Sequence, residues 1–400
     1  MRKRLLAFFG SLALWASTAP AQETETLLLS GSGIDDTANW DFKVSGGRQA
    51  NEWKTIPVPS NWEMQGFGAH RYWSDWEDGA QAPDHTGWYR HRFTPPEHWK
   101  DRAVDIVFGA SMTDTEVRIN GERAGPIHHG GFYEFRYDVT DLLRFGQENL
   151  LEVTVCKYSS NTSINLAERR ADYWLFGGIF RPVWLEARPE QRITRLAVDA
   201  RHTGELTARV HLAGLQAKGR LVGQVETLEG EPVGSSFSTQ VKAGQETAEL
   251  VAIIPDVQPW SAEWPNRYRL GVQLKSEAGS LHRVEETIGF RTVELRPGDG
   301  LYVNGIKIRL KGVNRHSFWP TTGRATSREL SVEDVKLIRG MNMNAVRMSH
   351  YPPDRHFLEA ADDYGLYVID ELAGWQDAYD TEPGEILVRE MIRRDVNHPS

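Results

Sequence analysis

Between residues 314 and 371, polar and charged residues follow three short apolar segments. They are Asn314-Arg315-His316, then Arg347 with Ser349 and His350, and finally Asp370-Glu371. An arginine fork can hold a carboxylate ionised and oriented. Histidines can donate or accept hydrogen bonds to a polyhydroxylated ligand. We therefore expect the three segment ends to form one polar site.

Arg347 is the most informative of these residues. An arginine at the end of a buried strand is costly unless a carboxylate pairs with it. The 400-residue sequence shows no obvious partner, so we predict that Arg347 orients a carboxylate supplied from elsewhere. Zinc binding by His316 and His350 is an alternative, but no H-E-x-x-H motif or cysteine cluster accompanies them.

From about residue 294 the elements that position these residues alternate between strand and helix. Alternation with short loops predicts a parallel α/β sheet, and the lack of a Gly-rich phosphate loop favours a (β/α)₈ barrel over a dinucleotide-binding fold. A whole barrel needs about 250 residues, so this region is expected to be only its first part. The predicted elements are a hairpin at 301–310 leading to a strand that ends near Gly312, strands at 344–348 and 366–369, and helices at 331–339 (with Ser331 as N-cap), 354–364 and 385–396.

The preceding residues are expected to form two β domains. Residues 40–187 contain short strands and turns without long helical periodicity, which predicts an all-β sandwich. Residues 188–293 contain cleanly alternating strands whose spacing fits a seven-stranded immunoglobulin-like sandwich. The chain has 14 Trp residues, which fit large sandwich cores or, alternatively, sugar-stacking surfaces.

The N-terminus has the pattern of an export signal. Arg2, Lys3 and Arg4 precede an apolar run at 5–15, and Ala19-Pro20-Ala21 fits a cleavage site. The run is too short to span a bilayer. We expect an exported protein, periplasmic or secreted, without membrane association after cleavage. Cys156 is the only cysteine, which excludes an intrachain disulfide, and we expect it to be buried.

The region from Asn344 to Ile369 resembles the signature of glycoside hydrolase family 2, the group of β-galactosidases, β-glucuronidases and β-mannosidases. The resemblance implies a multidomain protein: a signal peptide at 1–21, a sugar-binding jelly-roll β-sandwich at 22–187, an immunoglobulin-like β-sandwich at 188–293 and the incomplete start of a TIM-barrel catalytic domain at 294–400. Further motifs similar to this family occur in order at 59–63, 87–90, 119–122, 172–174, 177–181, 260–270, 311–316 and 395–400.

The family resemblance implies retaining hydrolysis of a terminal β-linked sugar by two glutamates, one acting as acid/base and one as nucleophile. In this family the acid/base Glu follows the Asn-His-Pro-Ser motif, here residues 397–400, and the nucleophile lies much later. We therefore expect both catalytic Glu beyond Ser400 and an inactive 400-residue chain. Glu371 matches neither position.

Five residues take expected roles from the resemblance. Arg347 matches the arginine beside the nucleophile, and His316 and His350 match histidines of the sugar subsite. Asp172 matches an acidic residue that the N-terminal domain directs toward sugar hydroxyls, and Asp84 falls near an Asn of similar role.

Trp375 marks a departure from the metal-dependent β-galactosidases. Those enzymes place a magnesium-ligating Glu at this position, and an indole cannot ligate Mg²⁺. We therefore expect neither metal nor cofactor. Trp375 and Trp319 are expected to stack on a substrate ring instead.

The leading prediction is an exported exo-β-glycosidase acting on a glycan or oligosaccharide. It is closest to the β-galactosidase branch, because Asn-Arg-His and Ser-His-Tyr-Pro both occur. β-Glucuronidase or β-mannosidase specificity and a non-catalytic carbohydrate-binding protein stay open as alternatives. The net charge of −9 and the lack of a basic patch argue against a nucleic-acid partner. The sequence leaves open whether the protein is a homo-oligomer.

Overall fold

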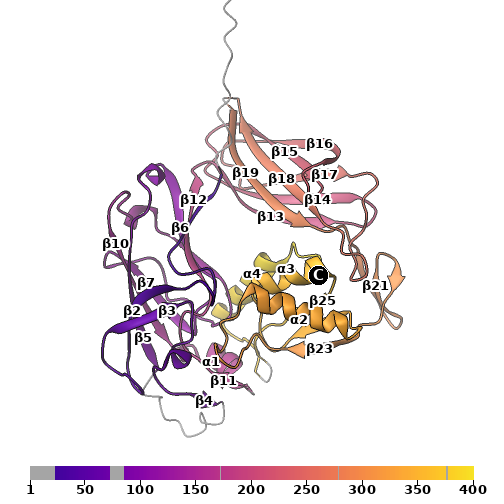
Figure 1. The fold of residues 1–400 in the computed structure, drawn as a ribbon. Helices are drawn as coiled ribbons and strands as arrows, with labels where there is room; N and C mark the ends of the chain where they lie inside the picture. The colour runs from indigo at the N-terminus through magenta and orange to yellow at the C-terminus, as the bar shows by residue number, and fades with distance from the viewer. Residues whose placement is uncertain (1–22, 73–84, 172, 278, 375–376) are drawn as a thin grey trace, which may run out of the picture.

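The computed structural model describes residues 23–72, 85–171, 173–277, 279–374 and 377–400. The predicted signal peptide and the candidate site residues Asp84, Asp172 and Trp375 lie outside these ranges. The chain forms a β-sandwich from its N-terminal part, a second β-sandwich, and a strand-helix region that packs beside both (Figure 1). The fold-class prediction is confirmed.

Two antiparallel sheets form the N-terminal sandwich, in the orders β1-β12-β6-β9 and β3-β2-β5-β10-β7-β8, with β4 and β11 as a separate ribbon. Alternate residues of its strands face a core rich in aromatic rings, including Trp40, Phe42 and Trp62. The strands are β1 Glu25–Leu28, β2 Ala38–Val44, β3 Lys54–Val58, β4 Arg71–Tyr72, β5 Thr86–Phe93, β6 Arg102–Phe108, β7 Asp114–Ile119, β8 Glu122–Arg123, β9 Phe135–Asp138, β10 Asn149–Cys156, β11 Trp174–Leu175 and β12 Val183–Pro189.

Two expectations for this domain are wrong. Val153 and Val155 of β10 are buried, but Cys156 faces the other side of the sheet and is only half-buried, since side chains alternate along a strand. The domain also contains helix α1, Thr162–Arg169, where an all-β sandwich was expected. The Asn161 side chain accepts a hydrogen bond from the Ile164 amide and begins this helix. Its eight residues are too few for a clear periodic pattern.

The second sandwich has seven strands in sheets ordered β13-β14-β17 and β16-β15-β18-β19. Its alternating strands bury Leu, Val and Ile between the two sheets, as predicted. Trp260 is fully buried outside this core, where its indole donates to the Asp362 carbonyl in the strand-helix region. The strands are β13 Arg192–Ala200, β14 Glu205–Ala213, β15 Gly219–Glu226, β16 Pro232–Val241, β17 Thr247–Ile253, β18 Tyr268–Ser276 and β19 Gly279–Ile288.

The strand-helix region begins with a small antiparallel sheet and continues as three parallel strands, β23-β24-β25, covered by helices. Two predicted boundaries are wrong. A strand begins at Gly312 instead of ending there, and the first helix is capped by Ser327 because Ser331 is buried against His356 inside it. The elements are β20 Val293–Arg296, β21 Gly300–Val303, β22 Ile306–Lys307, β23 Gly312–Arg315, α2 Arg328–Gly340, β24 Ala345–Met348, α3 Arg355–Tyr364, β25 Tyr367–Ile369 and α4 Glu382–Asp395.

Candidate functional site

The parallel register brings the three polar segment ends to one edge of the sheet. Asn314 of β23 is opposite Arg347 of β24, and Arg347 is opposite Ile369 of β25. The loops that follow these strands carry His316, His350 and Glu371. The carboxyl ends of parallel barrel strands are where such folds place their active sites.

Arg347 has a carboxylate partner within the chain, which corrects the sequence analysis. Its Nε lies 2.6 Å from Oε2 of Glu371, and its Nη2 donates to Oε1 at 2.8 Å. The two residues follow neighbouring strands, and the Glu371 side chain is the more buried of the two. This two-point contact fixes the plane of the carboxylate.

Glu371 also holds His350. The Nδ1 atom of His350 lies 3.0 Å from Oε1 of Glu371. The ring of His350 meets the ring of His316 edge to face, with 5.3 Å between centroids. The structure therefore brings together His316, Arg347, His350 and Glu371, as expected for one polar site.

The N-terminal sandwich supplies part of the wall behind His316. Nδ1 of His316 lies 3.2 Å from the Tyr351 hydroxyl, and the His316 ring contacts Tyr173 edge to face. Arg324 is 2% exposed and its guanidinium lies over the rings of Tyr351 and Tyr173, at 4.3 and 4.4 Å. The sequence analysis missed Arg324, because only the docking of the two domains encloses it.

A buried carboxyl from α1 holds the loop that follows Glu371. The Tyr379 hydroxyl donates to Oε1 of Glu168 at 2.8 Å, and the Gly131 amide donates to Oε2 at 2.7 Å. The Tyr133 hydroxyl contacts that of Tyr379 and accepts from the Ala373 amide. Burial raises the pKa of Glu168 to about 7. The N-terminal domain thus positions a loop of the barrel region.

Asp370, beside Glu371, is a second perturbed carboxyl. Burial and the nearby Asp395 carboxylate raise the pKa of Asp370 to about 7. Burial acts in the same direction on Asp395, but the adjacent Arg394 outweighs it, so the pKa of Asp395 is lowered. A proton is therefore held at Asp370 in preference to Asp395.

The remaining candidate residues are not part of this polar group in the described structure. Trp319 is 42% exposed beyond β23. Asp84, Asp172 and Trp375 lie outside the described residues. Within those residues no group of three or more His, Cys, Asp or Glu is arranged to hold a metal ion. In the same part of the chain, no helix is long and apolar enough to cross a bilayer.

The chain thus consists of two β-sandwiches followed by the first strand-helix units of a barrel. An arginine–carboxylate pair and two histidines lie at the ends of the barrel strands. Three models of one family match successive parts of the chain. They are described as the sugar binding domain of glycosyl hydrolases family 2 at 35–189, glycosyl hydrolases family 2 at 191–291 and the TIM barrel domain of that family at 293–400. The chain belongs to the glycosyl hydrolases family 2.

The relatives that match the chain include proteins named as β-galactosidases and a protein named as a putative β-glucuronidase. A β-galactosidase of Priestia megaterium is 33% identical over 402 residues, which is 87% of this chain and 37% of the relative. A putative β-glucuronidase of Formosa agariphila is 27% identical over 91% of this chain and 44% of the relative. The chain thus spans well under half the length of these relatives.

Solved structures show the same fold. A β-glucuronidase of Bacteroides uniformis superposes with a TM-score of 0.77 at 25% identity, over 94% of this chain and 46% of that chain. A putative β-galactosidase from Bacteroides fragilis gives a TM-score of 0.75 at 24% identity, over 94% and 57%. Both comparisons include all three parts of the chain.

Proposed function

We propose that this chain is part of an exported, retaining exo-β-glycosidase that hydrolyses terminal β-linked sugars, with β-galactosides as preferred substrates. The observation that carries the proposal is the group formed by Arg347, Glu371, His350 and His316 at the ends of parallel barrel strands. Family membership and a β-galactosidase relative support it. The two catalytic glutamates are proposed to come from the part of the relatives that this chain does not span.

Each residue of the group takes a role in this proposal. Arg347 orients the nucleophile carboxylate and keeps it ionised. Glu371 fixes the plane of the Arg347 guanidinium. His316 and His350 hydrogen-bond sugar hydroxyls. Asp172 and Asp84 are proposed to reach the same sugar from the N-terminal domain.

We propose that turnover needs no metal or cofactor. The support is Trp375, because an indole stands where metal-dependent relatives carry a carboxylate. Trp375 is then available to stack on the sugar ring. Unchanged activity after dialysis against a chelator would support this, and recovery of lost activity by added Mg²⁺ would contradict it.

A second candidate function is β-glucuronidase activity. It is favoured by the Formosa agariphila relative and the Bacteroides uniformis structure, both named as β-glucuronidases. β-Mannosidase activity and a purely carbohydrate-binding role remain further alternatives.

The deciding experiment assays the full-length protein on nitrophenyl β-galactoside, β-glucuronide and β-mannoside. Galactoside turnover with retention at the anomeric carbon, followed by NMR, is the expected result. Turnover of another glycoside alone would overturn the galactosidase proposal. Sugar binding without any turnover would overturn the enzyme proposal and leave the binding function. Fractionation of the producing cells tests export.

A further inference from the structure

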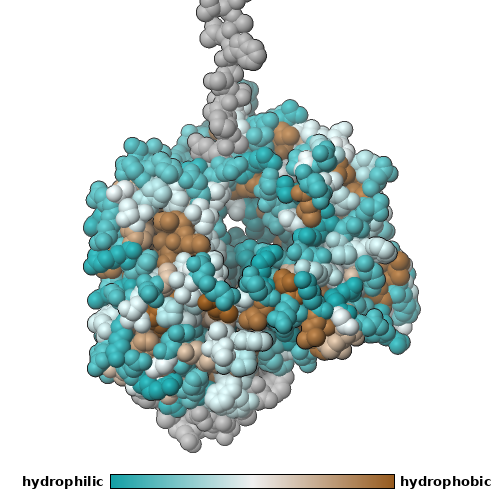
Figure 2. All heavy atoms as spheres, viewed as in Figure 1, coloured by the Kyte–Doolittle hydropathy of each residue, from teal (hydrophilic) through white to brown (hydrophobic). Residues whose placement is uncertain are grey.

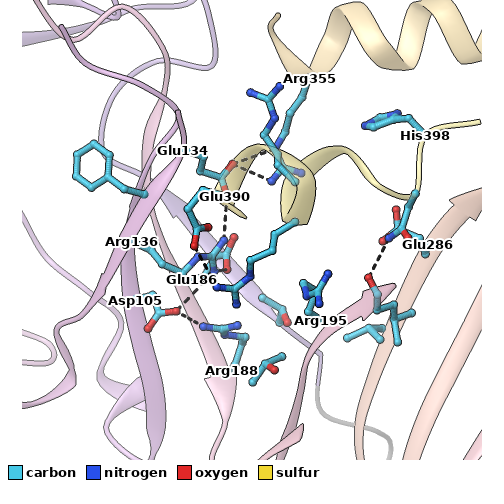
Figure 3. Close-up of a pocket in the computed structure, with 18 of the residues that line it drawn as sticks. Asp105, Glu134, Arg136, Glu186, Arg188, Arg195, Glu286, Arg355, Glu390 and His398 are labelled. Carbon is cyan, nitrogen blue, oxygen red and sulfur yellow. Dashed lines mark hydrogen bonds and ion pairs between the residues drawn. The ribbon is translucent and has the colours of Figure 1, made fainter. Parts of the chain in front are cut away.

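The N-terminal sandwich contacts the strand-helix region both at the open surface and in the interior. The surface contact lies along a wide cleft of about 1490 Å³, which Figure 2 shows as an opening with hydrophilic walls. Arg355 of α3 pairs with Glu134 at the wall of this cleft at 2.8 Å, with the arginine side chain 49% exposed (Figure 3). Exposed ion pairs of this kind contribute little. The surface contact is therefore too weak to fix a loop of the barrel region.

Helix α1 supplies an interior contact between the same two domains (Figure 1). Two of its side chains bind the loop of residues 370–381, which joins β25 to α4 and carries Glu371. One is Ser163, whose hydroxyl accepts a hydrogen bond from the Asp380 amide at 2.9 Å. The other is Glu168, which is fully buried. Of these two contacts, only the one made by Glu168 can change with ionisation.

Four groups form a chain of hydrogen bonds between Glu168 and the loop. The Ala373 amide donates to the Tyr133 hydroxyl at 3.3 Å, and that hydroxyl lies 2.9 Å from the Tyr379 hydroxyl. The Tyr379 hydroxyl donates to Oε1 of Glu168 at 2.8 Å. Ala373 lies two residues beyond Glu371, the carboxylate that pairs with the arginine of the candidate site. The chain therefore reaches from a buried carboxyl to the segment that positions this pair.

The amide at one end sets the direction of the chain. An amide can only donate, so the Tyr133 oxygen accepts from Ala373 and the Tyr133 proton is directed to Tyr379. The Tyr379 proton is then directed to Glu168, whose other oxygen, Oε2, accepts from the Gly131 amide at 2.7 Å. Both oxygens of Glu168 therefore face donors, which is the arrangement that suits an ionised carboxylate.

Protonation of Glu168 disturbs this arrangement. A neutral carboxyl must carry its proton on Oε1 or Oε2, and each already faces a donor. A proton on Oε1 turns the Tyr379 hydroxyl towards Tyr133, and the Tyr133 proton then has no acceptor within the chain. A proton on Oε2 competes with the Gly131 amide and leaves Oε1 a weaker acceptor. In either case the hydrogen bonds that reach Ala373 weaken.

The surroundings of Glu168 place its ionisation near neutral pH. Burial is the largest influence and raises the pKa of Glu168, and Asp114 raises it further. The Gly131 amide, Arg169 and the Tyr379 hydroxyl lower the pKa, which leaves it at about 7. Because the Tyr379 hydrogen bond favours the ionised form, ionisation in turn favours that hydrogen bond. This local preference is smaller than the opposing effect of burial, which governs the stability of the whole fold.

Other titratable groups interact electrostatically with Glu168. Burial raises the pKa values of Tyr133, Tyr173 and Tyr379, so these hydroxyls keep their protons at neutral pH. The hydrogen bond to Asp114 raises the pKa of His129, which therefore also titrates near neutral pH. A test must separate the ionisation of Glu168 from that of His129.

We propose that Glu168 is a positioning residue for the candidate site: its ionised form holds the loop that carries Glu371, and its neutral form holds that loop less firmly. For the proposed glycosidase, the consequence is that Arg347 is oriented best when Glu168 is charged. This consequence rests on the proposed function. The hydrogen-bond chain and its dependence on ionisation do not.

The first test is hydrogen–deuterium exchange of the full-length protein at pH 6 and pH 8, measured by mass spectrometry on peptides of the 370–381 loop. After correction for the intrinsic rates, exchange in the wild type should be about fivefold slower at pH 8, since hydrogen bonds to a charged group are stronger than neutral ones. Glu168→Gln cannot ionise, so its corrected exchange should be equal at both pH values.

Two further variants separate ionisation from a merely structural contact. Ser163→Ala is the matched control, because it removes the other α1 contact to the same loop without a titratable group. It should speed the corrected exchange by the same factor at both pH values. Tyr379→Phe has nearly the same shape, breaks the chain and leaves Glu168 in place, so the loop should exchange fast at both pH values.

Two results of this exchange experiment would overturn the proposal. One is equal corrected exchange of the wild-type loop at pH 6 and pH 8. The other is a pH dependence that survives in Glu168→Gln or in Tyr379→Phe, because it would assign the effect to another group such as His129.

The second test is the ratio of the kcat values of wild type and Glu168→Gln between pH 6 and pH 8, on a glycoside that the full-length protein hydrolyses. Titrations common to both proteins cancel in this ratio. It should rise by up to about fivefold as the pH passes through 7. A constant ratio would overturn the link between the loop and turnover. Absence of hydrolysis by the wild type, with pH-dependent exchange intact, would overturn only the glycosidase proposal.

Discussion

Arg347 and Glu371 form a two-point ion pair across the ends of β24 and β25, with Nε 2.6 Å from Oε2 and Nη2 2.8 Å from Oε1. Glu371, which follows the third parallel strand of the barrel region, therefore orients the guanidinium of Arg347. The plane of the Arg347 guanidinium is thus fixed independently of the nucleophile carboxylate that it is proposed to orient. His350 shares the same carboxylate, which joins both groups into one unit.

Arg347→Lys in the full-length protein should lower kcat about 100-fold while KM changes less than about threefold. Lysine keeps the charge but loses the fork, so the loss falls on an interaction made in the transition state. Steady-state kinetics on the nitrophenyl glycoside that proves to be the substrate measures it. Arg309→Lys, at an exposed position, is the matched control. An unchanged kcat would show that Arg347 does not orient a reacting group.

Glu168 should make stability depend on pH. Its pKa is about 7 in the folded chain against 4.5 ordinarily, so the fold prefers the neutral carboxyl. The stabilisation is fully present below about pH 4.5 and is lost as the pH rises through 7. The loss amounts to about 3 kcal/mol at most, at 1.36 kcal/mol per unit.

Glu168→Gln should remove this dependence. Thermal unfolding of wild type and variant at pH 5 and pH 8 measures it, and the variant should gain relative stability at pH 8. Glu148→Gln, an exposed carboxylate paired with Arg92, serves as control. Unfolding temperatures of wild type and Glu168→Gln that change equally between pH 5 and pH 8 would contradict this prediction.

The strands and the polar strand ends could be predicted because both follow from local periodicity. Alternation in β10 and β14 marks the buried face of each strand, and parallel strands place their carboxyl ends at one edge. The start of α2 could not be predicted with the same accuracy. Ser327 and Ser331 are both plausible caps, and only the burial of Ser331 against His356 decides between them.

The contacts that complete the site depend on tertiary packing. Glu371 pairs with Arg347 because of the register between β24 and β25, which no motif specifies. Arg324 and Glu168 are buried where the N-terminal domain meets the barrel region. The positions of these polar residues in the amino-acid sequence do not indicate how the two domains pack together.

Arg181 and Asp354 join the N-terminal sandwich to the barrel region through a buried ion pair of 2.7 Å. Burial alone would raise the pKa of Asp354, but Arg181 and His356 outweigh it, and the net shift is downward. Asp354→Ala should cost about 3–5 kcal/mol, because it leaves the arginine buried and unpaired. Chemical unfolding measures the loss.

The double variant Arg181→Met/Asp354→Ala should be more stable than Asp354→Ala alone, since the orphaned charge is gone. The exposed pair Arg90–Glu152 is the control, and Glu152→Ala should cost less than about 1 kcal/mol. Equal costs for the buried and exposed pairs would contradict the role of Arg181 and Asp354 as an interdomain contact.

Tyr351 should set the tautomer of His316. Burial raises the pKa of Tyr351, so its hydroxyl keeps a proton at pH 7, and Nδ1 of His316 lies 3.2 Å away to accept it. His316 is then expected to carry its own proton on Nε2. Two-bond ¹H–¹⁵N spectra of histidine-labelled protein, assigned with His316→Gln, measure the tautomer directly. Tyr351→Phe removes the donor and should produce a mixture of tautomers. A proton on Nδ1 in the wild type would reverse the direction of the hydrogen bond and contradict this assignment.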